Sequence, residues 1–281
     1  MGLTIEDLGF VYGLGTAYAR RALEGVSLAV EPGGMAVVLG ATGSGKSTLL
    51  RLAAGLLVPT DGRVVVDGID AAGPESRRLR GRVGLVFQRP ESQLFAASVA
   101  DDVAFGPKNL GATDSEARRT AEEALACVGL DPDAFGPRSP FSLSGGEARR
   151  AAIAGVLAMR PAYLLLDEPT AGLDAAGRDA VIASIATARR RAGIIVVTHD
   201  AEEFLPSAEQ ALVLADGAPV FAGGPAELLV DPTRLIVAGL ALPEVLEVQV
   251  LAREAGCALP MSTLDPVLAA DMLASACERP A

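Results

Sequence analysis

The chain has 281 residues, of which half are hydrophobic, and its formal net charge is −11. This acidic balance argues against a nucleic-acid-binding protein and against direct adhesion to anionic lipid, because both kinds of partner favour basic surfaces. No uncharged apolar run reaches the roughly 18 residues that a membrane-spanning helix needs. The three cysteines are far apart, as expected for a protein of a reducing compartment.

Strands and helices are predicted to alternate along the chain. Apolar β-rich runs open the sequence at 3–12 and 26–30, and buried strands are expected at 36–40, 83–87, 163–167 and 194–198. Helices are expected at 48–57, 114–130 and 174–193. This alternation predicts a mostly parallel α/β core. A helical segment at about 90–160 is inserted in it, and a further segment begins at about 231, where Asp265-Pro266 favours a helix start.

The string GATGSGKST follows the predicted strand at 36–40 and opens a helix, the context that the phosphate-binding pattern G-x-x-x-x-G-K-[ST] requires. Backbone N–H groups of such a turn bind phosphate oxygens, helped by the positive end of the helix. The lysine reaches the outer phosphates, and the hydroxyl that follows it can bind Mg²⁺. A glycine-rich turn without function is the alternative. The predicted nucleotide-binding residues here are Gly40, Ala41, Thr42, Gly43, Ser44, Gly45, Lys46, Ser47 and Thr48.

A second string, YLLLDEPTAGLD, places two acids at the end of a buried strand. Asp167 is positioned to hold a Mg²⁺ ion together with the phosphates. Glu168 follows directly and can accept a proton from a water that attacks the γ-phosphate. The alternative is that the two acids only end the strand, and that Asp174 only caps the next helix.

A third string, LSGGEARRAAIAG, sets two glycines at the start of a helix. A free helix N-terminus with a serine hydroxyl is a second anion site. One nucleotide does not need two such sites from one chain, whereas two chains facing head to tail do.

Together these strings resemble the ATP-binding cassette (ABC) ATPases over roughly residues 1–230. The resemblance implies a P-loop NTPase core, an N-terminal antiparallel β subdomain, an inserted helical subdomain at about 90–160 and a small C-terminal extension at 231–281. It implies ATP and Mg²⁺ as cofactors, and two cassettes that sandwich two ATP molecules. In that arrangement Ser144, Gly145 and Gly146 serve the ATP of the partner chain. Asp174, the last residue of the second string, matches the residue that closes the D-loop.

The same resemblance assigns further site residues. Gln88 matches the glutamine that reaches Mg²⁺ and the attacking water, and His199, the chain's single histidine, matches the residue that contacts the γ-phosphate. Catalysis is thus expected from Glu168, His199 and Gln88, and metal binding from Ser47, Gln88 and Asp167. Tyr12 matches the aromatic that stacks on adenine, with Tyr18 as a rival. The chain departs from the family at Glu147, where glutamine is usual.

The strings FQRPESQLF and VADDVAFGPKNLG look specifically like the ATPases of energy-coupling factor (ECF) and cobalt or nickel importers. This resemblance implies a position at the cytoplasmic face of the cell membrane. It implies three partners: a second ATPase chain, identical or paralogous, a transmembrane energy-coupling component, and a substrate-binding membrane component. No nucleic-acid partner is expected, because the net charge is −11. Glu91, Asp101 and Asp102 are expected to receive arginines of the transmembrane partner, unless they only form a solvated helix start. The segment at 231–281 is expected to add dimer contacts.

The expected function is therefore ATP hydrolysis that drives uptake of a vitamin or a transition-metal ion, which a separate subunit binds. A soluble ABC-class ATPase not coupled to transport is the alternative. Such proteins carry long coiled-coil inserts or two cassettes in one chain, whereas here the segment between Lys46 and Ser144 is short and shows no heptads. A small-molecule kinase with a phosphate-binding loop would not need LSGGE.

Overall fold

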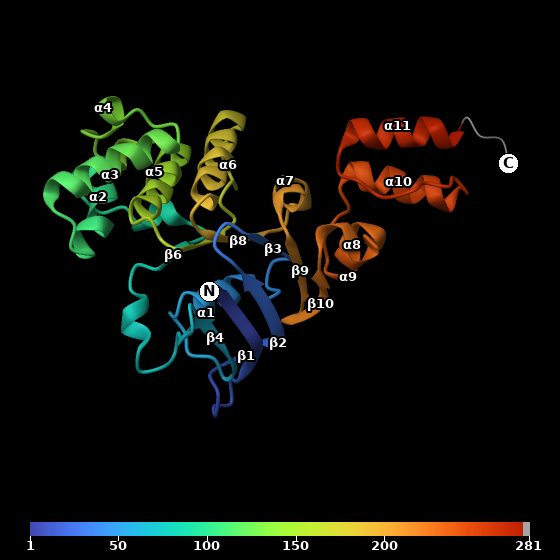
Figure 1. Cartoon of the computed structure of the whole chain (residues 1–281), viewed down its shortest axis with the longest axis horizontal. Coiled ribbons are helices and arrows are strands. Elements are labelled where there is room, and N and C mark those ends of the chain that lie inside the picture. The colour runs from blue at the N-terminus through green and yellow to red at the C-terminus, as the bar shows by residue number, and fades with distance from the viewer. Residues whose placement is uncertain (278–281) are drawn as a thin grey trace.

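A six-stranded sheet forms the centre of the computed structural model, which describes residues 1–277 (Figure 1). The strand order is β10-β9-β3-β8-β7-β6, and neighbouring strands are parallel except for β10, which pairs antiparallel with β9. The strands are β3 (Met35–Leu39), β6 (Val83–Val86), β7 (Tyr163–Asp167), β8 (Gly193–Thr198), β9 (Gln210–Ala215) and β10 (Ala218–Gly223).

A second, antiparallel sheet is built mainly from the N-terminal part of the chain, in the order β2-β1-β4-β5. Helix α1 (Lys46–Ala53) shares a buried apolar cluster with this sheet and with one face of the parallel sheet. The strands are β1 (Leu3–Tyr12), β2 (Arg20–Val30), β4 (Asp61–Val66) and β5 (Ile69–Asp70).

The connection from β6 to β7 carries the inserted helices, which lie to one side of the sheets (Figure 1). They pack on one another through small apolar residues such as Ala117, Ala121 and Ala151, all fully buried. The helices are α2 (Val99–Asn109), α3 (Asp114–Cys127), α4 (Pro132–Phe135) and α5 (Gly145–Ala158), with 3₁₀ turns at Pro90–Gln93 and Pro140–Ser142. Another 3₁₀ turn, Ser76–Leu79, lies before β6.

The remaining helices follow β7 and β8 or form the C-terminal part, which projects from the far side of the molecule (Figure 1). In residues 1–277 no helix combines the length and the apolar character that crossing a bilayer requires. Residues 278–281 of the predicted extension lie outside the described residues. The helices are α6 (Ala175–Arg189), α7 (Ala201–Phe204), α8 (Pro225–Val230), α9 (Thr233–Val237), α10 (Glu244–Glu254) and α11 (Pro266–Cys277), with a 3₁₀ turn at Leu205–Ser207.

Strand β3 shows how the core is divided. Successive side chains of a strand point to opposite faces, so Val37 and Leu39 join the helices of the insert and α6, whereas Ala36 and Val38 face α1 and the antiparallel sheet. All four are fully buried, as expected for a parallel strand covered on both sides. The predicted fold class is confirmed. The helix expected at 48–57 ends earlier, at Ala53, because Gly55 has a φ of +70°, which ends the helical path.

Candidate nucleotide-binding and hydrolysis site

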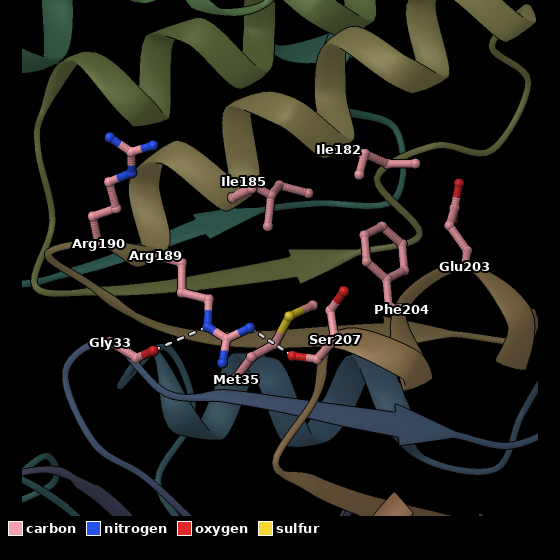
Figure 2. A pocket seen from close by; sticks show the side chains of 10 residues that line it. Gly33, Met35, Ile182, Ile185, Arg189, Arg190, Glu203, Phe204 and Ser207 are labelled. Carbon is pink, nitrogen blue, oxygen red and sulfur yellow. Dashed lines mark hydrogen bonds between the residues drawn. The ribbon is translucent and has the colours of Figure 1, made fainter.

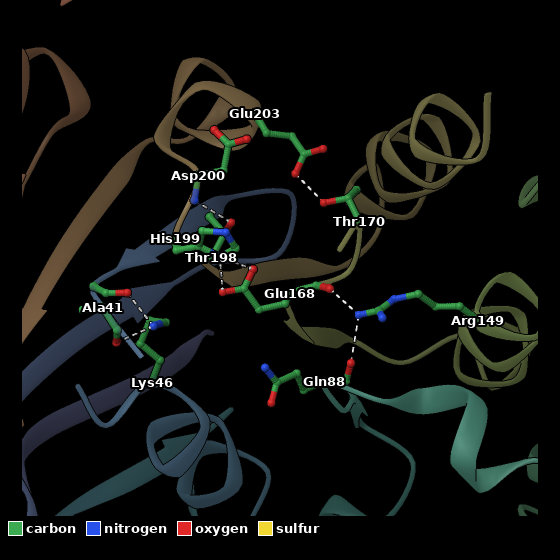
Figure 3. A network of polar contacts seen from close by, with 11 residues as sticks. Ala41, Lys46, Gln88, Arg149, Glu168, Thr170, Thr198, His199, Asp200 and Glu203 are labelled. Atoms are coloured by element: carbon green, nitrogen blue, oxygen red, sulfur yellow. Dashed lines mark hydrogen bonds and ion pairs between the residues drawn. The ribbon is translucent and has the colours of Figure 1, made fainter. Parts of the chain in front are cut away.

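Four parallel strands deliver the predicted site residues to one edge of the sheet. The phosphate-binding loop follows β3, Gln88 follows β6, Asp167 ends β7, and His199 follows β8. Parallel strands end on the same side of a sheet, and in open α/β sheets ligands bind outside those carboxyl ends. The sequence order therefore places residues that are far apart in the chain around one point (Figure 3).

Two glycines of the phosphate-binding loop are sterically required. Gly40 and Gly45 have φ values of +155° and +99°. A Cβ atom on Gly40 would lie 2.4 Å from the carbonyl oxygen of Leu214, and one on Gly45 would lie 2.6 Å from that of Ala22. No side chain caps the start of α1, so its first N–H groups can bind an anion.

Lys46 is buried beneath this loop. Its Nζ donates hydrogen bonds to the carbonyl oxygens of Gly40, at 2.5 Å, and Ala41, at 2.9 Å (Figure 3). Burial lowers the pKa of the Lys46 ammonium from its ordinary value, and the charges of Glu168 and Asp167 oppose that shift. The arrangement holds a cation inside the loop, where it can meet phosphate charge.

Asp167 is buried at the end of β7, and burial is the main cause that raises the pKa of its carboxyl. A hydrogen bond from the Ser47 hydroxyl acts in the opposite direction. Mg²⁺ prefers oxygen ligands and is usually held by one or two carboxylates together with substrate phosphates. The hydroxyl and carboxylate oxygens of Ser47 and Asp167 fit that requirement.

Glu168 and His199 are in direct contact. The Nδ1 atom of His199 lies 2.9 Å from each carboxylate oxygen of Glu168 (Figure 3). The Glu168 side chain is 11% exposed and that of His199 66% exposed. Glu168 also has a φ of +50°, uncommon for a residue with a side chain. Such backbone strain persists where the surroundings impose it, often at functional sites.

One cavity of about 150 Å³, here called the strand-edge cavity, brings most of these groups together, with His199 outside its lining. Gln88, Asp167 and Glu168 line it together with most of the phosphate-binding loop. Arg20 also lines it, from the start of β2, and had no signal in the sequence. Only the structure reveals it, because the pairing of Arg20 with Tyr12 across β1 and β2 follows several register shifts.

The rival tyrosines lie in different places. The hydroxyl of Tyr12 is 3.2 Å from Oγ1 of Thr48, and its ring packs edge-on against Phe10. Tyr18 is 91% exposed in the loop between β1 and β2. The geometry favours Tyr12 as the aromatic beside the phosphate-binding loop.

Ser144, Gly145 and Gly146 do not line the strand-edge cavity of their own chain. Ser144 caps α5, and its Oγ accepts a hydrogen bond from the N–H of Glu147, while Glu147 Oε2 accepts one from the N–H of Ser144 at 2.7 Å. This second bond is the main cause that lowers the pKa of Glu147. The unusual carboxylate is thus used to close a capping box. Beside Gly145 the Cβ direction is open space.

Asp174 has a capping role in this chain. Its Oδ1 accepts a hydrogen bond from the N–H of Gly177 at 2.8 Å, at the start of α6. The helix-cap alternative for Asp174 therefore describes what its carboxylate does here.

Two buried charged residues near the site were missed. Arg149 on α5 donates to three backbone carbonyls, among them that of Glu168. Glu203 on α7 accepts a hydrogen bond from the Thr170 hydroxyl (Figure 3). Arg149 is followed by Arg150, and such a pair on a helix is usually exposed to solvent. The sequence therefore contains no sign that the Arg149 side chain points into the protein.

A separate, mainly apolar cavity of about 380 Å³ lies between α6 and α7 (Figure 2). Ile182, Ile185 and Phe204 line it, and Arg189 at one end donates to the carbonyl oxygen of Gly33 at 2.9 Å. No predicted site residue lines this cavity, so it is not part of the nucleotide site.

The fold and the strand-edge cavity define a P-loop ATPase. Residues 23–171 match the family model described as ABC transporter. The chain is 43% identical to the energy-coupling factor transporter ATP-binding protein EcfA2 of Symbiobacterium thermophilum, over 96% of this chain and 95% of that protein. It is 44% identical to the protein of the same name from Lactiplantibacillus plantarum, over 87% of this chain and 84% of that protein.

Solved structures agree. The structure of cbiO1 from Clostridium perfringens, described as part of an ABC transporter complex, is 32% identical, with a TM-score of 0.71 over 88% of this chain and 98% of that one. A dimeric ATP-binding cassette in a post-hydrolysis state with ADP and phosphate is 27% identical, with a TM-score of 0.71 over 79% of this chain and 98% of that one.

The chain belongs to the ABC transporter family and, within it, to the energy-coupling factor transporter ATP-binding proteins. It is an ATP-binding ATPase subunit, which confirms the predicted enzyme class.

Proposed function

We propose that this ATPase energises an ECF-type importer as a head-to-tail dimer of cassettes held against a membrane protein. The proposal rests mainly on the segment from Gln88 to Phe95, which lines two separate cavities. Gln88 lines the strand-edge cavity, and Gln93, Leu94 and Phe95 line a groove of about 620 Å³ between this segment, α2 and α5. We call it the helical groove. A partner seated in it contacts the segment that also borders the nucleotide.

Hydrolysis follows from the positions of the side chains. With the phosphates on the loop and on Lys46, Glu168 lies at the far side of the cavity and accepts the proton of the attacking water. His199, hydrogen-bonded to Glu168, holds that carboxylate in place and reaches the γ-phosphate. Gln88, which lines the same cavity, orients the attacking water.

Mg²⁺ would be held by Ser47 and Asp167, with Gln88 lining the same cavity, and would supply positive charge that neutralises the phosphate oxygens. Ser47, Asp167 and Gln88 line the same cavity, which supports this assignment.

A second cassette completes each site in this proposal. The open N-terminus of α5 with Ser144, Gly145 and Gly146 faces the ATP of the partner chain. A similar cassette was solved as a dimer with ADP and phosphate, which supports a dimer of cassettes. The partner is this chain again or a paralogue.

The helical groove is the proposed docking site for the transmembrane energy-coupling component. Phe95 and Phe105 meet edge-on in it, with ring centroids 4.8 Å apart, and both rings are about half exposed. Asp102 adds a carboxylate to this apolar surface. The groove is mainly apolar and is lined by one acid, Asp102, and one arginine, Arg80. A short segment that sets an arginine beside Asp102 and apolar residues elsewhere suits this surface.

The structure separates the acids that were expected to act together. Asp102 lines the helical groove, whereas Asp101 lines a different hollow with Lys108 and Asp114. Consecutive residues of a helix do not share a face. Asp102 Oδ2 also accepts hydrogen bonds from the N–H groups of Phe95 and Ala96, both at 2.8 Å. Of the two, Asp102 is the one proposed to meet the partner's arginine.

The C-terminal extension is proposed to add dimer contacts. Helices α10 and α11 pack on each other and leave large apolar side chains exposed, among them Val248, Leu251, Val267 and Leu268. Exposed apolar patches of this kind mark interaction sites more often than free surface.

We further propose that the complex sits at the cytoplasmic face of the cell membrane and imports a vitamin or a transition-metal ion. A substrate-binding membrane component selects the solute in the proposed scheme.

The test is to express this chain with its candidate membrane partners and purify the whole complex through a tag on the transmembrane component. We expect the chain to co-purify, and we expect Phe105→Ala, in the groove, to reduce the amount recovered. Phe141→Ala, at another exposed phenylalanine outside the groove, is the matched control. A chain that hydrolyses ATP yet never associates with a membrane component supports the soluble-ATPase alternative instead.

A further inference from the structure

Arg149 is a buried charge that belongs to no ion pair in residues 1–277. It lies in the first half of α5, after the LSGGE string, and is only 8% exposed. Its NH2 group donates to the carbonyl oxygens of Gln88, at 2.9 Å, and Glu168, at 2.5 Å (Figure 3). Its Nε donates to the carbonyl oxygen of Pro169 at 3.3 Å. Every acceptor thus belongs to a segment that borders the strand-edge cavity.

These contacts fix the backbone of Glu168 from one side. The N–H of Glu168 donates to the carbonyl oxygen of Val197 at 2.9 Å, and its own carbonyl accepts from Arg149. The peptide groups before and after Glu168 are therefore both fixed by hydrogen bonds, which keeps this residue at its uncommon φ of +50°. The carboxylate, which lies 2.9 Å from His199, depends on this backbone position for its direction.

The same helix lines the helical groove. Ala152 and Val156 line the groove, and they lie three and seven residues after Arg149 on α5, a spacing that puts all three near one face of the helix. A shift of α5 against a groove occupant therefore moves the guanidinium that holds the carbonyls of Gln88 and Glu168.

We infer that Arg149 is a positioning residue for ATP hydrolysis, through which α5 sets the backbone of Glu168 and Gln88. This role requires a planar guanidinium, because its N–H groups point in fixed directions toward separate carbonyl oxygens. A lysine ammonium has its donors on one atom and cannot hold the same set of carbonyls in place. The inference rests on the proposed role of Glu168 as the base.

Arg149→Lys tests the inference because it keeps the charge and loses the fork. We expect the kcat of the full chain to fall by about 10- to 100-fold, the range that a small misplacement of a catalytic group produces, while the Kd for Mg-ATP stays within about twofold. The melting temperature is measured on the same samples. If the lysine variant does not fold, Arg149→Gln, whose amide can still donate to a carbonyl, takes its place.

A double-mutant cycle with Glu168→Gln separates positioning from a general structural role. Once the base is gone, its position no longer matters, so Arg149→Lys should change the remaining rate by less than about twofold. Arg150→Lys is the matched control on the same helix. Arg150 donates to the carbonyls of Val128 and Gly129, at 3.2 and 3.1 Å, away from the cavity, and its effect should multiply with that of Glu168→Gln.

The outcomes distinguish an error in the role of Glu168 from an error in the role of Arg149. If Glu168→Gln turns over ATP at the parent rate, the assignment of the base is wrong and the inference loses its premise. If Glu168→Gln is slow but the effect of Arg149→Lys multiplies with it, the base stands and the positioning role is overturned. A folded Arg149 variant with parent kcat also overturns it.

Discussion

The strand-edge cavity and the helical groove are built in opposite ways. In the phosphate-binding loop, neighbouring backbone atoms leave no room for a side chain at Gly40 and Gly45. The charged groups of the cavity, such as Lys46 and Asp167, are on buried side chains. The groove is mainly apolar, its aromatic rings are about half exposed, and its residues come from several segments between 80 and 159. Phosphate chemistry needs fixed donors, whereas docking needs a shaped apolar surface that a partner can cover. A variant should therefore affect either turnover or docking, with α5 as the element common to both.

The largest effect on ATP turnover is expected from a change of the proposed general base, Glu168. Glu168→Gln should keep ATP binding and lower turnover by about 10²–10⁴-fold, because it removes the general base and retains the size and polarity of the side chain. Steady-state phosphate release measures this. Glu202→Gln, the same change at an exposed residue of α7, should hydrolyse like the parent. Parent-like turnover in Glu168→Gln would exclude the assigned role.

Ser144→Arg tests whether the cavity is completed by a second chain. Turnover should fall by about 10²-fold or more, the usual loss when donors to developing charge are removed, while the monomer still binds Mg-ATP. Mixing it with a Lys46→Ala chain should restore partial activity, since a mixed dimer of like chains has one doubly damaged site and one intact site. A verified mixed dimer that stays inactive would argue for sites built within one chain.

Lys46→Ala should weaken binding of Mg-ATP by about 10- to 100-fold, because a hydrogen bond to a charged group contributes about 1.5–3 kcal/mol. Titration calorimetry gives the dissociation constant directly. The only other lysine of the sequence, Lys108, is exposed and paired with Asp114, so Lys108→Ala is the matched control. Equal affinities of the two variants contradict the placement of Lys46 in the phosphate site.

On the groove side, Asp102→Asn should weaken capture of the transmembrane component by about 10-fold, and Asp101→Asn should change it little. The first removes a charge from an apolar surface, and the asparagine oxygen can still accept the N–H groups of Phe95 and Ala96. An exposed charge outside the groove contributes only about 0–1 kcal/mol. Both variants should bind Mg-ATP normally. Equal losses would mean that the two hollows form one docking surface.

The smallest effect is a pH dependence at Glu203, which lines the apolar cavity between α6 and α7. Burial is the main cause that raises the pKa of Glu203, which is bonded to Thr170 and lies near Arg178. Between the unfolded and the raised folded pKa the native state binds more protons, so the free energy of unfolding falls as pH rises through that window, and the loss is complete above it. Glu203→Gln lacks this loss. Its melting temperature relative to the parent should therefore rise by a few degrees from acid to neutral pH.

That relative shift is read by calorimetry across a pH series, with Glu202→Gln as the exposed control. A difference between Glu203→Gln and the parent that stays constant with pH would contradict the cause given for the shift.

The sequence by itself determined most of the cavity. Phosphate binding depends on backbone geometry that only consecutive residues can supply, so Gly40–Thr48 is readable as a string, and strands that end together place Asp167, Glu168 and His199 at one edge. It did not determine the C-terminal limit of α1, the direction of Arg149, or the separation of Asp101 from Asp102. The tertiary structure decided these, because a turn, a buried guanidinium and a helix face are fixed by neighbours that lie far away along the chain.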